Sequence, residues 1–194
     1  MSLLDLEFDS PEALVQQVND MMPVMDGLIE DLGLSDNDAV QSVREGISPH
    51  IILGLSDEHL DAIFVTGLNL AQAGNTDQAQ VVFLKLATLK AHDYRFWYAL
   101  GTTLQLQQKL AEAVRAYLMS LSLRATDVDA YLRMGECLLA AEEFENALGC
   151  FQMAQALCAD GHGQDDQRQA ADGMIAFIAE QMQVDTSSPY HKDN

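Results

Sequence analysis

The sequence predicts an all-α solenoid, because one 34-residue unit occurs three times in succession between residues 60 and 159. Four columns keep this period. They hold a glycine, a leucine, an alanine and an aromatic residue: Gly67, Gly101 and Gly135; Leu70, Leu104 and Leu138; Ala79, Ala113 and Ala147; and Phe83, Tyr117 and Phe151. This is the tetratricopeptide (TPR) pattern, in which every repeat is a pair of antiparallel helices.

Each column has a physical role in such a repeat. The glycine of the first helix and the alanine of the second, Gly67 and Ala79 in the first repeat, allow the two backbones to approach closely. The aromatic residue lies four positions after the alanine and so on the same helix face, where we expect it to fill the gap to the neighbouring unit. A glycine inside a helix costs about 1 kcal/mol relative to alanine. Three glycines at one spacing therefore indicate a packing requirement.

Length and charge limit the classes of partner. The 194 residues suggest one domain, with a formal net charge of −20. Residues 1–59 carry 13 of the acids and a single base, Arg44. The strongly acidic balance argues against nucleic acid and against an anionic membrane surface. With no signal-peptide pattern at the start and no apolar run long enough to span a membrane, the sequence predicts a soluble cytoplasmic protein.

An acidic N-terminal helical arm is expected over residues 1–55. Ser10 and Pro11 form a helix start, and Pro23 ends or kinks that helix. A second apolar stripe follows over residues 25–32, and a short helix over about 36–44. Stripes of this kind are not left exposed to water, so we expect them to dock either on the end of the solenoid or on another copy of the chain.

The TPR domain is expected over residues 56–183. Ser56 caps its first helix. The repeats span 60–93, 94–127 and 128–161, a capping helix spans 164–183 and seals the last open face, and residues 184–194 form a disordered tail. The capping helix starts at Asp165 or Asp166, and its apolar stripe consists of Ala171, Met174, Ile175, Ile178 and Met182.

No pattern of catalytic or metal-ligating residues emerges. The histidines show no spacing typical of a nucleophile or a zinc protease, and there is no phosphate loop or dinucleotide motif. Cys137, Cys150 and Cys158 are odd in number and lack C-x-x-C spacing, which favours buried apolar cysteines. Cys158 and His162 are four positions apart, but two ligands across a glycine-rich loop are weak support for a metal site. We expect neither an enzyme nor a cofactor or metal.

The functional surface is expected on the first helix of each repeat, which lines the concave side of a TPR array. The inward positions carry several apolar groups, so the groove suits an apolar, extended segment of another protein. Arg95 is the one basic residue among them, so the groove lacks the cationic clamp that would hold a C-terminal carboxylate. We therefore predict a client-binding groove formed by Phe64, Leu68, Ala71, Arg95, Tyr98, Thr102, Gln105, Leu106, Leu132, Glu136 and Leu139.

Over residues 44–160 the sequence resembles the class II chaperones of bacterial type III secretion, the SycD/LcrH group of TPR chaperones for translocator proteins. The resemblance rests on the stretch from Gly46 to Ser56, on Ala73-Gly74 at the first turn, and on the residues entering the second repeat. The stretch that enters the second repeat reads Asp93-Tyr94-Arg95-Phe96-Trp97. The resemblance continues in the third repeat with Glu136-Cys137-Leu138-Leu139.

The resemblance implies a non-enzymatic function. Such chaperones keep hydrophobic translocators soluble in the bacterial cytoplasm before export, grip a proline-containing extended segment in the concave groove, and form homodimers through N-terminal helices. Of Phe64, Leu68 and Ala71, only Phe64 matches the inward aromatics of that family, which implies differently shaped client pockets. A TPR scaffold or regulatory adaptor for soluble partners is the alternative that the residues leave open.

Overall fold

The computed structural model describes residues 46–187, and side chains up to residue 182. The helices expected between residues 10 and 44 lie outside the described residues. The described elements are the helices α3 (Pro49–Ile52), α4 (Asp57–Gln72), α5 (Thr76–Leu89), α6 (Tyr94–Leu106), α7 (Leu110–Leu123), α8 (Val128–Ala140), α9 (Phe144–Ala159) and α10 (Asp165–Ser187).

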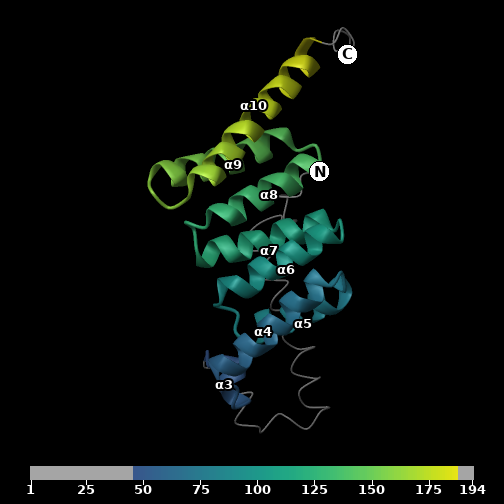
Figure 1. Ribbon diagram of the computed structural model, residues 1–194, viewed down its shortest axis with the longest axis vertical. Helices are drawn as coiled ribbons and strands as arrows, with labels where there is room; N and C mark the ends of the chain where they lie inside the picture. The colour runs from purple at the N-terminus through teal and green to yellow at the C-terminus, as the bar shows by residue number, and fades with distance from the viewer. Residues whose placement is uncertain (1–45, 188–194) are drawn as a thin grey trace, which may run out of the picture.

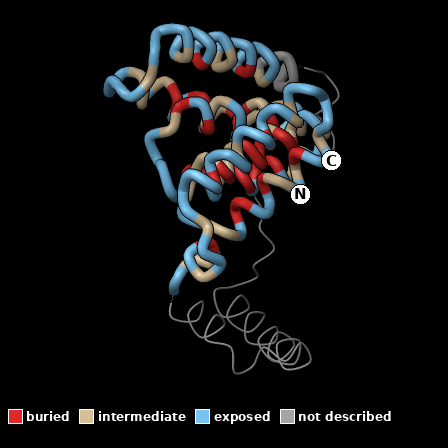
Figure 2. The backbone as a smooth tube through the Cα atoms, turned by 60° about the horizontal axis from the view of Figure 1, so that its bottom comes forward, coloured by how far each residue is buried: buried red, intermediate tan, exposed pale blue. Residues whose placement is uncertain are grey.

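These helices form the predicted all-α solenoid (Figure 1). The pairs α4–α5, α6–α7 and α8–α9 are the three repeats, and from α4 to α10 each helix packs on the next along the chain. The short helix α3 lies at one end of the stack and α10 at the other. Buried residues lie between the helices, while the outward sides are exposed (Figure 2). Over residues 46–187 the element order contains no strand.

The first helix of every repeat begins at a side-chain cap. The hydroxyl of Ser56 accepts a hydrogen bond from the backbone N–H of His59, as predicted, and His59 Nδ1 accepts one from the N–H of Ser56. Asp93 and Asp127 cap α6 and α8 in the same way. Such caps satisfy amide donors that have no partner within the helix, and so they fix where each repeat starts.

The turn between the two helices of a repeat uses one left-handed residue each time. Gly74, Gln108 and Glu142 have φ values of +80°, +60° and +62°, and successive members of this set are separated by exactly one repeat period. A left-handed conformation is free of steric cost only for glycine. The second and third repeats therefore hold the turn geometry with residues that do not favour it.

The core confirms that the glycine column is a packing requirement. A Cβ atom placed on Gly67, Gly101 or Gly135 would lie 2.7–2.8 Å from a ring carbon of Phe83, Tyr117 or Phe151, respectively. Each aromatic residue thus covers the glycine of its own repeat, whereas the sequence suggested that it fills the gap to the neighbouring repeat. The difference arises because the glycine removes the side chain that would otherwise separate the two helices.

The ends of the stack are closed by α3 and α10. His50 of α3 is buried, with its Nδ1 atom 3.1 Å from the carbonyl oxygen of Leu89 at the end of α5. Helix α10 buries Ala171 and Ile178 against the third repeat. It begins at Asp165 and continues to Ser187, beyond the end expected at residue 183. Within residues 46–187 no helix is long and apolar enough to cross a membrane.

Candidate functional site

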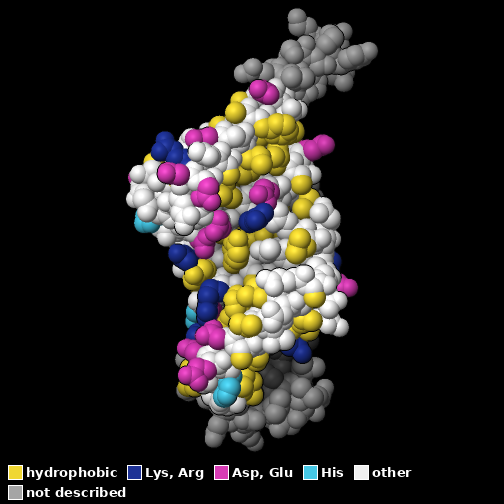
Figure 3. All heavy atoms as spheres, in the orientation of Figure 1, with side chains coloured by type: hydrophobic (Ala, Val, Ile, Leu, Met, Phe, Trp, Pro, Cys, Tyr) yellow, Lys and Arg dark blue, Asp and Glu magenta, His cyan; other side chains and the backbone are white. Residues whose placement is uncertain are grey.

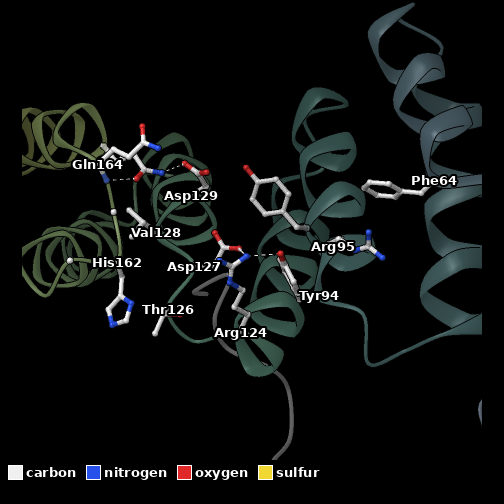
Figure 4. Close-up of a pocket in the computed structure, with 14 residues that line it drawn as sticks. Phe64, Tyr94, Arg95, Arg124, Thr126, Asp127, Val128, Asp129, His162 and Gln164 are labelled. Carbon is white, nitrogen blue, oxygen red and sulfur yellow. Dashed lines mark hydrogen bonds and ion pairs between the residues drawn. The ribbon is translucent and has the colours of Figure 1, made fainter. Parts of the chain in front are cut away.

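A pocket of about 440 Å³ lies on the side of the solenoid formed by the first helices of the repeats. Its walls come from α4, α6, the α7–α8 loop, the start of α8, and the α9–α10 loop with the first turn of α10. Figure 4 shows Phe64 on one side, Asp129 and Gln164 on the other, and Tyr94 and Arg95 between them. Of the predicted groove residues, Phe64, Arg95 and Tyr98 line this pocket.

Arg95 lies in the pocket wall between acidic and aromatic partners. Its guanidinium group donates to both carboxylate oxygens of Asp93 at 2.9 and 2.6 Å and lies 3.0 Å from Asp61 Oδ1. It also lies 5.7 Å from the ring centroid of Phe64 and 5.6 Å from that of Phe96. The bond to Asp93 raises the pKa of Arg95. Arg95 is therefore protonated, and the carboxylates of Asp61 and Asp93 balance its positive charge.

The carboxylate of Asp93 is stabilised in return. Burial alone would raise the pKa of Asp93, but hydrogen bonds from the side chain and the backbone N–H of Arg95 outweigh burial, and the pKa lies below its usual range. Asp93 both caps α6 and pairs with Arg95, so a single carboxylate fixes the start of the helix and the position of the cation.

The floor of the groove between α6 and α8 is a polar network. The hydroxyl of Tyr117 donates to Gln105 Oε1 at 2.8 Å and lies 3.3 Å from Thr102 Oγ1. The Nε2 group of Gln105 donates to Glu136 Oε2 at 3.0 Å, which joins the second and third repeats. The sequence placed Thr102, Gln105 and Glu136 in the groove but predicted no bond between them.

The apolar groove residues divide into two kinds. Phe64, Ala71, Tyr98, Leu132 and Leu139 are half-buried and packed against the core. By contrast, Leu68 and Leu106 expose 38 % and 59 % of their surface. These two leucines contribute apolar area that another chain can cover. Figure 3 shows apolar side chains along the face in view, with basic and acidic side chains gathered toward its left edge.

Sequence reasoning missed the part of the pocket that comes from the loops between repeats and from the first turns of α6, α8 and α10: Tyr94, Arg124, Thr126, Asp127, Val128, His162, Gln164 and Gln167. Arg124 donates to the hydroxyl of Tyr94 at 2.5 Å and lies 3.8 Å from Asp127. A signal for part of this set was present. Lys90 and Asp93 recur one repeat later as Arg124 and Asp127, at the junction where each repeat meets the next.

Arg133, like Arg124, is a basic residue that the predicted inward positions did not include. It donates to Glu136 Oε2 at 3.0 Å and also bonds Tyr98. Burial would lower the pKa of Arg133, but these two bonds outweigh it and the pKa is raised. In Tyr98, burial and then the charge of Asp129 raise the pKa of the phenol. Both side chains are therefore held in their protonated forms.

The described residues hold no group of three or more histidine, cysteine or acidic side chains that could bind a metal ion. Burial raises the pKa of the Cys137 thiol to about 12 and that of Cys150 to about 11. These cysteines therefore remain protonated thiols near neutral pH, which is the opposite of what a nucleophile or metal ligand requires.

No protein-family model matches the chain. The uncharacterized protein YgeG of Escherichia coli K12 is 22 % identical to it over 125 residues, covering 64 % of this chain and 77 % of YgeG. Among solved structures, a type III secretion (T3SS) complex from Aeromonas hydrophila aligns with a TM-score of 0.68 at 23 % identity. That match covers 74 % of this chain and 95 % of the other.

Two further structures contain a bound partner. The Yersinia enterocolitica type III secretion chaperone SycD, in complex with a peptide of the translocator YopD, aligns at 24 % identity with a TM-score of 0.63. It covers 66 % of this chain and 97 % of SycD. Pseudomonas aeruginosa PcrH, bound to the chaperone-binding region of PopB, aligns at 28 % identity with a TM-score of 0.59, over 62 % of this chain and 98 % of PcrH.

The chain shares its fold with the type III secretion translocator chaperones. The resemblance that the sequence suggested is thereby confirmed, and it extends across nearly the whole length of SycD and PcrH. The parts of this chain beyond that shared region account for about a third of its length.

Proposed function

We propose that this protein is a cytoplasmic, non-enzymatic chaperone of a type III secretion system that binds an extended segment of a hydrophobic translocator in its groove. The observation that carries the proposal is the shared fold with SycD and PcrH, which are solved in complex with a translocator peptide and with a chaperone-binding region. The exposed Leu68 on α4 and Leu106 on α6 support the location of the binding site.

The physical properties of the groove suit this function. A translocator with long apolar segments aggregates unless those segments are covered. A groove held in place by the network of Arg95 with Asp93 and of Gln105 with Glu136 is organised before the client arrives, which lowers the entropy cost of binding an extended chain. The net charge of −20 keeps a loaded complex apart from its copies by electrostatic repulsion.

The first experiment is co-expression with hydrophobic proteins encoded beside the gene, followed by a pull-down from the soluble fraction. If the protein is a chaperone, a co-expressed protein that is insoluble alone becomes soluble and copurifies with it at fixed stoichiometry. Copurification of a regulator that is already soluble, without rescue of any insoluble protein, would instead support a TPR scaffold or adaptor.

The groove itself is tested with Leu106→Ser and Leu68→Ser. Both side chains are exposed, so the substitutions remove client-facing apolar area at little cost to the fold. Phe64→Ala is less informative, because Phe64 packs against Phe83 and Phe96. The matched control is Val81→Ser on α5, which is 52 % exposed on a second helix of a repeat. Equal loss of client rescue by the control and the groove variants would contradict the groove assignment.

We also propose that residues 1–55 mediate a homodimer. An alternative dimer is described for the Yersinia enterocolitica chaperone SycD, and the arm carries apolar stripes that require a partner surface. A chain starting at residue 36 is expected to have the mass of a monomer in light scattering where the full chain has twice that mass. An unchanged association state would show that residues 1–35 of the arm are not the interface.

A further inference from the structure

Two carboxylates, Asp127 and Asp129, and two arginines, Arg95 and Arg124, line the pocket, and both arginines are paired with carboxylates. Asp61 and Asp93 share the guanidinium group of Arg95, and Asp127 is the partner of Arg124. Asp129 accepts a hydrogen bond from the neutral amide of Gln167 at 2.6 Å. Within residues 46–182 no lysine, arginine or histidine nitrogen lies within 4.0 Å of its carboxylate. The adjacent pair of Arg133 and Glu136 is itself neutral.

Both arginines of the pocket wall, Arg95 and Arg124, already have charged and aromatic partners. Arg95 has two carboxylate partners and lies against two aromatic rings. Arg124 lies 4.8 Å from the ring centroid of Tyr94 and bonds its hydroxyl. A client carboxylate would therefore have to displace an existing partner of Arg95 or Arg124. A client cation can bind Asp129 without displacing another cation. The net negative charge of the chain also favours a cationic group of the client over an anionic one.

Aromatic surface lies in the same pocket. Tyr98, Tyr94 and Phe64 line it together with Asp129. Aromatic faces cover the aliphatic stem of a long basic side chain and attract its charged head. Gln167 holds Asp129 in position, because its own Oε1 atom accepts from the N–H of Gln164 at 2.9 Å. The volume of about 440 Å³ accommodates such a side chain with part of its backbone.

We propose that this pocket binds the side chain of an arginine or lysine in the client segment, with its cationic head on Asp129 and its stem against Tyr98. The inference rests on the proposed function in that it names a residue class which the groove selects in its client. Apolar contacts at Leu68 and Leu106 would then supply area, and Asp129 would set the register of the segment.

The test needs no client. The full-length, ¹⁵N-labelled protein is titrated with Nα-acetyl-arginine methylamide and, separately, with the citrulline analogue, which has nearly the same shape without the charge. We expect saturable shifts of the Gly163 amide and the Gln167 side-chain amide with arginine, and binding about fivefold weaker with citrulline, as for a partly screened ion pair over an aromatic ring.

Asp129→Asn is the decisive variant. It removes the charge and keeps an oxygen that can accept from Gln167, so we expect it to reduce arginine binding to the level of citrulline. Glu112→Gln is the control, because it removes the same charge from α7, outside the pocket. Equal binding of the two probes, an unchanged affinity in Asp129→Asn, or no saturable shift would each overturn the inference. Rescue of a client despite such a result would leave the proposed function intact.

Discussion

The ring of Tyr117 covers the Cα atom of Gly101 so closely that a Cβ atom at position 101 would lie 2.8 Å from Tyr117 Cε1. The ring is fully buried, and its hydroxyl bonds Gln105 on the floor of the groove. One contact inside the second repeat thus connects the packing of the core to the surface that we propose binds the client.

Gly101→Ala is expected to destabilise the protein by about 1–3 kcal/mol, because the added methyl group forces the buried ring of Tyr117 to move. Gly149→Ala is the matched control, since Gly149 also lies inside a helix but has no atom within 4 Å of its Cβ position. That substitution should stabilise the protein by up to about 1 kcal/mol. Urea denaturation measures both. A stabilising Gly101→Ala would contradict the packing requirement.

Gln108→Gly is expected to stabilise the turn between α6 and α7 by about 0.5–1 kcal/mol, because Gln108 occupies a left-handed conformation that glycine adopts without steric cost. The reciprocal change is Gly74→Ala at the equivalent turn. The Cβ position there is open, so the substitution isolates the conformational cost, and it should destabilise by about 1 kcal/mol. If both changes shift the urea midpoint in the same direction, backbone conformation does not control these turns.

Tyr117→Phe keeps the ring over Gly101 and removes only the hydroxyl. We expect a loss of about 1–2 kcal/mol in the free energy of unfolding, because the half-buried Gln105 loses its donor. A double-mutant cycle with Gln105→Leu measures the coupling. Additive effects of the two substitutions would show that the hydrogen bond contributes little.

The buried cysteines predict a pH dependence. The pKa of Cys137 is raised to about 12 and that of Cys150 to about 11, above the value of about 8.5 for a free thiol. The stability linked to each raised pKa is fully present below about pH 8.5 and is lost as the pH rises through the folded-state pKa, since the unfolded chain releases these protons first.

Thiol labelling checks the same two residues. At pH 8 we expect iodoacetamide to modify the half-buried Cys158 first and to leave Cys137 and Cys150 protected until denaturant is added. Peptide mapping by mass spectrometry identifies the modified residue, and Cys158→Ser should abolish labelling of the folded protein. Rapid modification of Cys137 in the folded state would contradict its burial.

The sequence by itself determined the solenoid. The glycine and aromatic columns, the cap at Ser56 and the start of α10 follow from local spacing, because each repeat contacts mainly its own helices and its nearest neighbours. It also predicts that the first helix of each repeat lines the groove, since the inward positions recur with the same period. Such patterns predict contacts that recur once in every repeat.

The tertiary structure alone decided how the groove residues combine. Phe64 of α4 and Gln167 of α10 line one pocket although the helices α5 to α9 lie between α4 and α10 in the sequence, and no local sequence pattern encodes that proximity. It also decided which charges are neutralised. In the sequence Arg95 is the one basic residue among the inward positions. In the folded chain Asp61 and Asp93 pair with it, while Asp129 has a neutral partner. Electrostatic balance depends on distances across repeats, which only the folded chain fixes.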